Sequence, residues 1–453
     1  MPSVARGRAI AGVFVRRWAR AAVRARFGLA SAEARRAAFA RETRHACEDL
    51  GPAFVKLGQL ASVRPDVFGA ELVFELERLQ DRVPPVPYEA VRAQVRRALG
   101  ADPEEIFASF EREPVASASV AQVHRAVLRE AYAPVWGAPL PAGAMVAVKV
   151  LRPDAAAVVA EDLRIARAAL RWPWPLRVAH RASLAGLLDE FAVTLADELD
   201  LRREGRTADR FAFDFRDDAL VRVPRVVWTR TARVVLTMEF VEGWRLSELT
   251  HAEREGVDAR GLAVHGAVAF MRQVLELGRY HADLHPANIF VTPDSRIAYL
   301  DFGIVGRLDA AERHAIAQVL AALVYGDAER ALTWSAALGV TVPAERRAAV
   351  RADLSALMRR TLSEDGRDVR HFGMGFLSML GRHGVAIPMG YGLLVKALVT
   401  VEGVARALYP DIDIIETSRP FVTGLLARRA ADPARLAERL PAAVRAGLRE
   451  FAR

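Results

Sequence analysis

The chain has 453 residues, of which 52% are hydrophobic and 26% are charged, and its formal net charge is +9 at pH 7. This length and composition predict a globular protein of two or three structural units. A single cysteine, Cys47, excludes an internal disulfide and fits a reducing compartment. The positive charge is spread through helical segments without zinc-finger spacing or another nucleic-acid module. We therefore expect no nucleic-acid partner and favour an anionic membrane surface.

The first segment, residues 1–47, predicts a basic amphipathic helix followed by a second helix. Ile10, Phe14 and Trp18 recur at i, i+4 and i+8, with arginines between them. One interpretation is that this helix adsorbs to anionic lipid. The other is that it packs on the rest of the protein and keeps its arginines in water.

The hydrophobic runs of the sequence predict neither a secretory signal nor a membrane-spanning helix. The apolar stretch of residues 9–15 is too short for a secretory signal. The best candidate for a spanning helix, residues 390–401, is interrupted by Lys396. We expect a cytoplasmic protein without a transmembrane segment.

Residues 48–104 predict helices with two proline-containing breaks, at 64–66 and 83–87. From 105 to 242 the pattern changes to a small mixed lobe. Its expected elements are strands at 120–128, 145–151, 222–228 and 233–240 and helices through 154–215. Residues 243–453 are mostly helical, apart from a strand-loop-strand near 280–302. This order predicts an α+β, protein kinase-like fold of two lobes, a small α/β N-lobe and a large helical C-lobe, preceded by a helical extension.

The strongest chemical motif lies in the second lobe. Residues 281–290 read HADLHPANIF, and residues 299–303 read YLDFG. Phosphoryl transfer needs a carboxylate that orients or deprotonates the acceptor, and Asp283 has that place. Asn288, five residues later, and Asp301 can supply oxygen ligands to one or two Mg²⁺ ions that bridge the phosphates of ATP.

Lysine is rare in this chain, which draws attention to each position that keeps it. Of 64 basic residues only Lys56, Lys149 and Lys396 are lysine, and arginine supplies the other 61. Lys149 follows a β-branched run, where a compact ammonium can hold the α- and β-phosphates. We expect the ammonium of Lys396, on an apolar helix, to lie in water outside the site.

An acid on a following helix should position Lys149, and Glu204 is our choice. The alternative is a solvated acidic face in which Glu198 simply pairs with Arg202 at i, i+4.

Two further segments should contact the nucleotide. Main-chain groups of Glu239 and Val241, in the linker between the lobes, should meet the adenine ring. The place of a glycine-rich loop is taken by the run Ala116, Ser117, Ala118 and Ser119. Methyl groups there limit the approach of the backbone to phosphate, and the two hydroxyls add donors. The absence of an Ala-Pro-Glu sequence after Asp301 argues against a platform for protein substrates.

Residues 51–59 read GPAFVKLGQ, and SVRPD at 62–66 and LQDRVPP at 79–85 follow. From about residue 50 to 422 the chain resembles the UbiB/AarF/ADCK family of atypical kinases. The first run matches the KxGQ signature of that family through Lys56, Gly58 and Gln59. In relatives this signature lies on an N-terminal helical extension that folds over the active site and restricts access by protein substrates.

The resemblance extends to the other motifs. It matches the alanine-rich loop to 116–119, the ExD motif to Glu198 and Asp200, and the helix glutamate to Glu204. It also matches the catalytic and metal positions to Asp283, Asn288 and Asp301. Four departures, Ser117, Thr207, Leu284 and Ala287, remove no charged group that the chemistry needs.

The resemblance implies ATP and Mg²⁺ as cofactors, ATPase or unorthodox kinase activity, and a role in isoprenoid-quinone biosynthesis or related lipid metabolism. Lys56 and the Glu198/Asp200 pair should close the extension over the cleft. The expected partners are a lipid or quinone-precursor substrate, an anionic membrane surface and quinone-biosynthesis enzymes. The oligomeric state stays open, a homodimer included.

Many relatives end in hydrophobic anchoring segments, and this chain stops at Arg453 without one, so we expect peripheral association with the inner face of the membrane. Two other functions compete with this interpretation. The catalytic loop also resembles that of aminoglycoside and choline kinases, which are soluble small-molecule kinases. A catalytically silent pseudokinase scaffold would keep the same fold without turnover.

Overall fold

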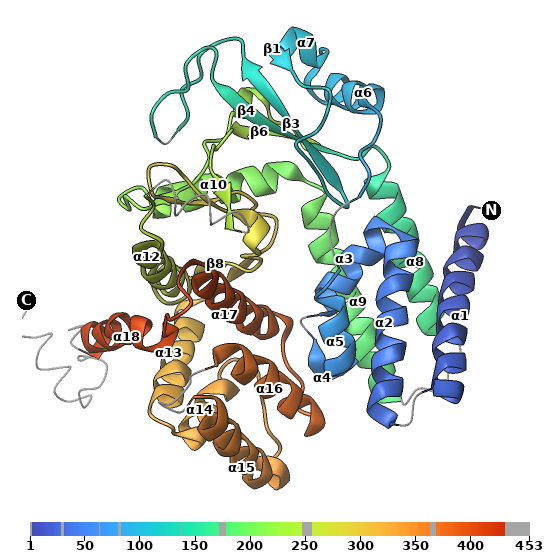
Figure 1. The fold of residues 1–453 in the computed structure, drawn as a ribbon, viewed down its shortest axis with the longest axis vertical. Helices are drawn as coiled ribbons and strands as arrows, with labels where there is room; N and C mark the ends of the chain where they lie inside the picture. Colours follow the sequence, from blue (N-terminus) through green and yellow to red (C-terminus); the bar gives the residue numbers. More distant parts are fainter. Residues whose placement is uncertain are drawn as a thin grey trace, which may run out of the picture.

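The computed structural model describes residues 2–28, 31–62, 64–79, 83–135, 137–171, 178–246, 256–362 and 368–430. Within these residues the chain forms a small lobe with a β-sheet, a larger helical lobe and a helical extension beside them (Figure 1). The mixture of sheets and many helices confirms the expected α+β class. Four residues of the motifs quoted above, Val63, Gln80, Asp81 and Arg82, lie outside the described residues.

The extension is a bundle to which two distant parts of the chain contribute. Its helices are α1 (Pro2–Gly28), α2 (Ala32–Leu50), α3 (Pro52–Ala61), α4 (Pro65–Phe68) and α5 (Ala70–Leu76), joined by α8 (Ala155–Arg171) and α9 (Val178–Glu198). At the far end of the bundle α4 packs against α16 (Val369–Arg382) of the helical lobe. The extension therefore touches both lobes. The boundaries expected at 47, 104 and 242 stay predictions.

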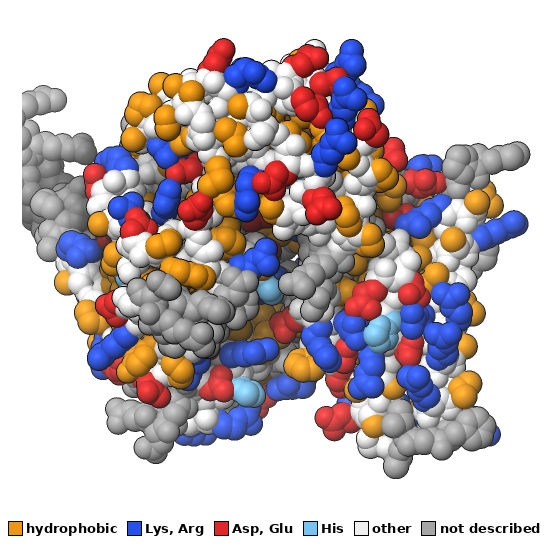
Figure 2. All heavy atoms as spheres, turned by 45° about the horizontal axis from the view of Figure 1, so that its top comes forward, with side chains coloured by type: hydrophobic (Ala, Val, Ile, Leu, Met, Phe, Trp, Pro, Cys, Tyr) orange, Lys and Arg blue, Asp and Glu red, His pale blue; other side chains and the backbone are white. Residues whose placement is uncertain are grey.

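The basic helix α1 packs on the protein through its apolar face. Ile10 is buried, the ring of Phe14 contacts Phe54, and Trp18 stacks on Phe39 with ring centroids 4.9 Å apart. Its arginines also have acidic neighbours: Arg17 Nη2 lies 2.8 Å from Asp49, and Arg6 Nε lies 2.9 Å from Asp162 of α8. Basic and acidic side chains are intermingled over this part of the surface (Figure 2). This face of α1 therefore packs on the rest of the protein, as the second interpretation of the sequence expects.

The small lobe is built on an antiparallel sheet of order β1-β3-β4-β6, with β2 paired to β3. Its elements are α6 (Tyr88–Leu99), α7 (Pro103–Ile106), β1 (Phe107–Phe110), β2 (Ala116–Ser117), β3 (Ala121–Leu128), β4 (Met145–Leu151), α10 (Leu201–Asp214), a 3₁₀ turn at Trp228–Arg230 and β6 (Val235–Glu239). Val146, Val148 and Val150 of β4 are buried against Val91 and Val95 of α6. This alternation turns Lys149 to the opposite face.

The expectation of a small-lobe strand at 222–228 is wrong, because only two residues there form a strand and that strand joins another sheet. The short strand β5 (Val221–Arg222) runs parallel to β10 (Ile297–Tyr299) and belongs to a sheet of the helical lobe. Toward β6 the segment makes a bridge between Val226 and Met238. Propensity alone could not tell which sheet would take this strand.

The helical lobe carries short strands around residues 281–303. Its elements are β7 (Trp244–Arg245), α12 (Ala259–Arg272), a π-turn at Gln273–Leu277, β8 (Arg279–His281), a 3₁₀ turn at Pro286–Asn288, β9 (Ile289–Val291), β10, β11 (Val305–Arg307), α13 (Ala310–Val324), α14 (Ala328–Ala336), α15 (Ala344–Thr361), α16, α17 (Met389–Leu408) and α18 (Ile414–Ala430).

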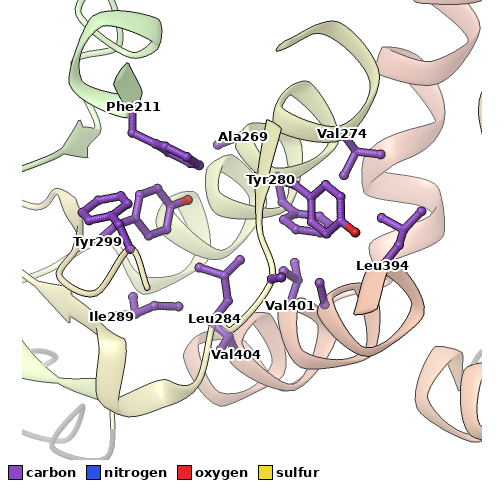
Figure 3. Packing of buried hydrophobic residues seen from close by; sticks show 14 of the residues in the cluster. Phe211, Ala269, Val274, Tyr280, Leu284, Ile289, Tyr299, Leu394, Val401 and Val404 are labelled. Carbon is purple, nitrogen blue, oxygen red and sulfur yellow. The ribbon is translucent and has the colours of Figure 1, made fainter. Parts of the chain in front are cut away.

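Helix α17 packs directly behind the loop that carries Asp283. Leu284 is 2% exposed and lies beside Val404 of α17, while Leu394 of the same helix lies toward Tyr280 of β8 (Figure 3). The departure to leucine at 284 therefore fills a core position between the loop and the helix. None of the helices in the described ranges has both the length and the apolar character that crossing a bilayer would need.

Candidate active site

Three charged side chains meet between the lobes. Lys149 Nζ of β4 lies 2.7 and 2.9 Å from the two carboxylate oxygens of Glu204 and 3.2 Å from Asp301 Oδ2. Glu204 is on the first turns of α10, which Asp200 caps by accepting a hydrogen bond from the Arg202 N–H. The cap fixes where the helix begins and so aims Glu204 at the lysine.

Burial and charge oppose each other in this cluster. Burial works against the charge of Lys149, but the carboxylates of Asp301 and Glu204 hold its pKa above the usual value. Burial also acts against ionisation of Asp301, yet Lys149 and the Gly303 N–H, 2.8 Å from Oδ1, hold its pKa below the usual value. An ammonium and an ionised carboxylate therefore face the cleft at neutral pH.

His281 links the loop that carries Asp283 to the segment that carries Asp301. Its Nδ1 accepts a hydrogen bond from the Asp283 N–H at 3.2 Å, so Nε2 carries the proton and donates to the Asp301 carbonyl. Burial lowers the pKa of this histidine, which suits the neutral form that the two bonds require. Asn288 closes the loop, because its Nδ2 donates to the Asp283 carbonyl at 3.1 Å.

The oxygen donors of the site suit Mg²⁺. The side chain of Asp301 is 41% exposed to the cleft, and the amide nitrogen of Asn288 is used within the loop, which leaves its Oδ1 for a ligand. No group of three or more His, Cys, Asp and Glu side chains among the described residues could hold a metal by itself. Two protein oxygens fit Mg²⁺, which commonly takes its other ligands from phosphates and water.

The expectation for Lys396 is wrong. Its ammonium lies 3.6 Å from Asp283 Oδ1, and its side chain is 27% exposed. Despite burial, the charges of Lys396 and Lys56 hold the pKa of Asp283 below its usual value. The sequence does not reveal this contact. A single lysine at the edge of an apolar helix face has the same pattern as a lysine whose stem lies along the surface and whose ammonium reaches water.

The KxGQ segment brings a second buried ion pair to the cleft. Lys56 Nζ of α3 lies 2.9 Å from Glu198 Oε1 at the end of α9, and the two side chains are 12% and 6% exposed. On the opposite side of α3, a Cβ on Gly58 would come within 2.3 Å of Leu79 Cδ1, so glycine allows the close packing there. Gln59 Nε2 reaches the Leu79 carbonyl at 3.4 Å.

The two acids of the ExD motif take different positions. Glu198 pairs with Lys56, and Asp200 pairs with Arg202 at 2.7 Å besides capping α10. The alternative in which Glu198 pairs with Arg202 is therefore not the arrangement found. Asp200 acts on the orientation of Glu204, while Glu198, at the end of α9, pairs with α3.

An arginine that sequence reasoning missed fixes the alanine-rich loop. Arg152 donates to Ser117 Oγ at 2.9 Å and to the Ala118 carbonyl at 3.0 Å, and it reaches the Pro84 carbonyl at 2.8 Å. Ser119 is buried. Ser117 thus serves as an acceptor for Arg152, and the loop of 116–119 is tied to the linker that leaves the extension. In the sequence Arg152 is one of 61 arginines, so no signal distinguishes it.

In the linker between the lobes, several polar groups of Glu239 already have hydrogen-bond or ion-pair partners within the protein. The Glu239 N–H donates to the Arg225 carbonyl at 2.8 Å, and its carboxylate pairs with Arg222 and Arg225. These bonds leave the Glu239 carbonyl and the main chain of Val241 as the groups expected to meet adenine.

Comparison with known proteins identifies the family of the chain. Residues 78–335 match the model of the ABC1 atypical kinase-like domain, and residues 374–413 match the UbiB helical domain. The chain is 35% identical over 399 residues to "Probable protein kinase UbiB" of Cellvibrio japonicus, covering 85% of this chain and 69% of that protein. It is 34% identical over 397 residues to the protein of the same description from Marinobacter nauticus, covering 85% and 70%.

A solved structure, "The complex structure of Rv3197-erythromycin from Mycobacterium tuberculosis", is similar with a TM-score of 0.46 and 22% identity, over 72% of this chain and 84% of that one. The match to the ABC1 atypical kinase-like domain, at residues 78–335, covers more than half of the chain and confirms the kinase-like fold. The chain belongs to the UbiB family of ABC1-type atypical kinases.

Proposed function

We propose that the protein binds Mg²⁺-ATP between its lobes and transfers or hydrolyses the γ-phosphoryl group in support of isoprenoid-quinone biosynthesis, of the ubiquinone type, or related lipid metabolism. The observation that carries this proposal is the cluster of Lys149, Glu204 and Asp301 within 3.2 Å. It unites a phosphate-binding ammonium, the acid that positions it and a metal-binding carboxylate.

Each remaining group has a place in this chemistry. Asn288 and Asp301 would hold the metal, which supplies positive charge to the phosphates. Asp283 would orient the attacking oxygen and accept its proton. The alanine-rich loop, tied by Arg152, would cover the phosphates, and Glu239 and Val241 would contact adenine. Family membership, and the description of relatives as UbiB proteins, support the pathway.

A membrane surface is the proposed place of action, on the inner face and by peripheral association, since a quinone precursor is hydrophobic. The exposed side of α1 supports this, because Val4 and Val15, 59% and 66% exposed, leave apolar surface among arginines. Quinone-biosynthesis enzymes are the proposed protein partners.

The test is Mg²⁺-dependent phosphate release from ATP by the purified protein, with and without vesicles that contain anionic lipid. Asp283→Asn and Lys149→Ala serve as controls. The proposal predicts hydrolysis that rises with the vesicles and falls to a small residual rate in both variants. No hydrolysis in any condition would contradict the ATPase and favour a scaffold. Phosphorylation of a hydrophilic alcohol without any effect of lipid would point to the small-molecule kinase.

A further inference from the structure

All three lysines of the chain lie at the cleft, each beside an acid. Lys149 pairs with Glu204, Lys56 pairs with Glu198, and Lys396 lies next to Asp283. The first two have roles in the motifs described above. Lys396, which comes from a helix late in the chain, has none.

The fold holds Lys396 at this place from two sides. Leu284, next to Asp283 in the loop, packs against the same helix α17 that carries the lysine (Figure 3). At the start of α17 the Tyr280 hydroxyl donates to the Gly390 carbonyl at 3.0 Å, which ties the helix to the strand that leads into the loop. The distance between ammonium and carboxylate is thus set by buried contacts rather than by a surface encounter.

Main-chain bonds fix the backbone of Asp283 but not its carboxylate. The N–H is bound to His281 and the carbonyl to Asn288. The carboxylate instead faces Lys396, whose Nζ lies 3.6 Å from Asp283 Oδ1. A cation on one oxygen leaves the other free to face an acceptor, and its charge offsets the nearby carboxylate of Asp301.

We infer that Lys396 is a positioning residue for phosphoryl transfer, which holds the Asp283 carboxylate in the orientation that receives the proton of the attacking oxygen. The inference rests on the proposed function. In the step that it serves, the oxygen of water or of an acceptor hydroxyl forms a bond to the γ-phosphorus while its proton passes to Asp283. The bond from phosphorus to the β–γ bridging oxygen breaks, and ADP leaves with that electron pair.

The experiment compares Lys396→Met and Lys396→Arg with the wild-type chain, and repeats Lys396→Met in an Asp283→Asn background. Arg382→Gln is the matched control, because it removes one positive charge from the exposed side of the neighbouring helix α16, where Arg382 contacts Ser378. For each protein kcat and KM for Mg²⁺-ATP hydrolysis, the Kd of the nucleotide and the thermal unfolding midpoint are measured.

We expect Lys396→Met to lower kcat at least about 10-fold, with KM and Kd within about twofold of wild type, as for an interaction made in the transition state. Lys396→Arg should recover part of the loss, and Arg382→Gln should match wild type. In the Asp283→Asn background the same change should alter the residual rate less than about twofold, because the group that Lys396 positions is already missing.

Several results would overturn the inference. These are a wild-type kcat in Lys396→Met, an equal loss in both backgrounds, or a loss of kcat matched by weaker nucleotide binding and a lower unfolding midpoint, as for a structural residue. A wild-type chain that does not hydrolyse ATP would refute the proposed function, and this role with it. An active wild type with an equally active Lys396→Met would refute this inference alone.

Discussion

Removing the ammonium of Lys56 should destabilise the protein more than removing any exposed charge. Lys56 and Glu198 lie 2.9 Å apart, and their side chains are 12% and 6% exposed. At an effective dielectric constant of about 20, two unit charges at this distance attract each other by about 6 kcal/mol before desolvation is counted. Breaking a buried pair by removing one partner commonly costs about 3–5 kcal/mol, because the other charge stays buried.

We therefore expect Lys56→Met to lower the free energy of unfolding by about 3–5 kcal/mol. The double variant Lys56→Met/Glu198→Leu should regain most of that loss, since an apolar pair of similar volume replaces both charges. Urea unfolding followed by tryptophan fluorescence measures both variants. Arg36→Gln is the control, because Arg36 pairs with Glu71 at an exposed site where solvent screens both charges, and it should leave the unfolding midpoint nearly unchanged. A Lys56→Met protein as stable as this control would refute the reasoning.

Three other outcomes follow from the structure. Arg152→Ala should weaken Mg²⁺-ATP binding by about 10-fold, measured calorimetrically, because the alanine-rich loop loses its tie to Ser117 and the linker; unchanged affinity would contradict that role. Gly58→Val should destabilise the protein by about 1–3 kcal/mol in urea unfolding through the clash with Leu79, and a neutral result would mean that Leu79 yields freely. Burial raises the pKa of the Cys47 thiol to about 12, so the folded protein at pH 8 should react with a disulfide reagent far more slowly than the protein in urea, and equal rates would show an open thiolate.

The lobes could be expected from the sequence because local patterns specify them. The alternation of valines in β4 identifies a half-buried strand, and the same alternation turns Lys149 toward the cleft. The spacing of Asp283, Asn288 and Asp301 lies within one loop and the strands beside it, so the chain itself keeps these groups near one another. Glu204 was expected from the order of strand and helix, and the structure places it against Lys149.

Contacts between distant segments could not be read in the same way. Lys396 meets Asp283 across 113 positions because α17 packs behind Leu284, and no local pattern encodes that packing. Arg152 bonds to a loop and a linker that precede it, and as one of 61 arginines it carries no distinguishing mark in the sequence. The segment that begins at Val221 has the composition of a strand, but which sheet it joins depends on tertiary structure.

The most direct test of the central claim is calorimetric binding of ATP to the wild-type chain and to Asp301→Asn, with Mg²⁺ and with a chelator. The account predicts saturable binding by the wild type that is weakened at least about 10-fold by the chelator and by the substitution, since the carboxylate and the metal hold the phosphates together. Equal affinity with and without Mg²⁺ in both proteins would contradict a metal-dependent nucleotide site between the lobes.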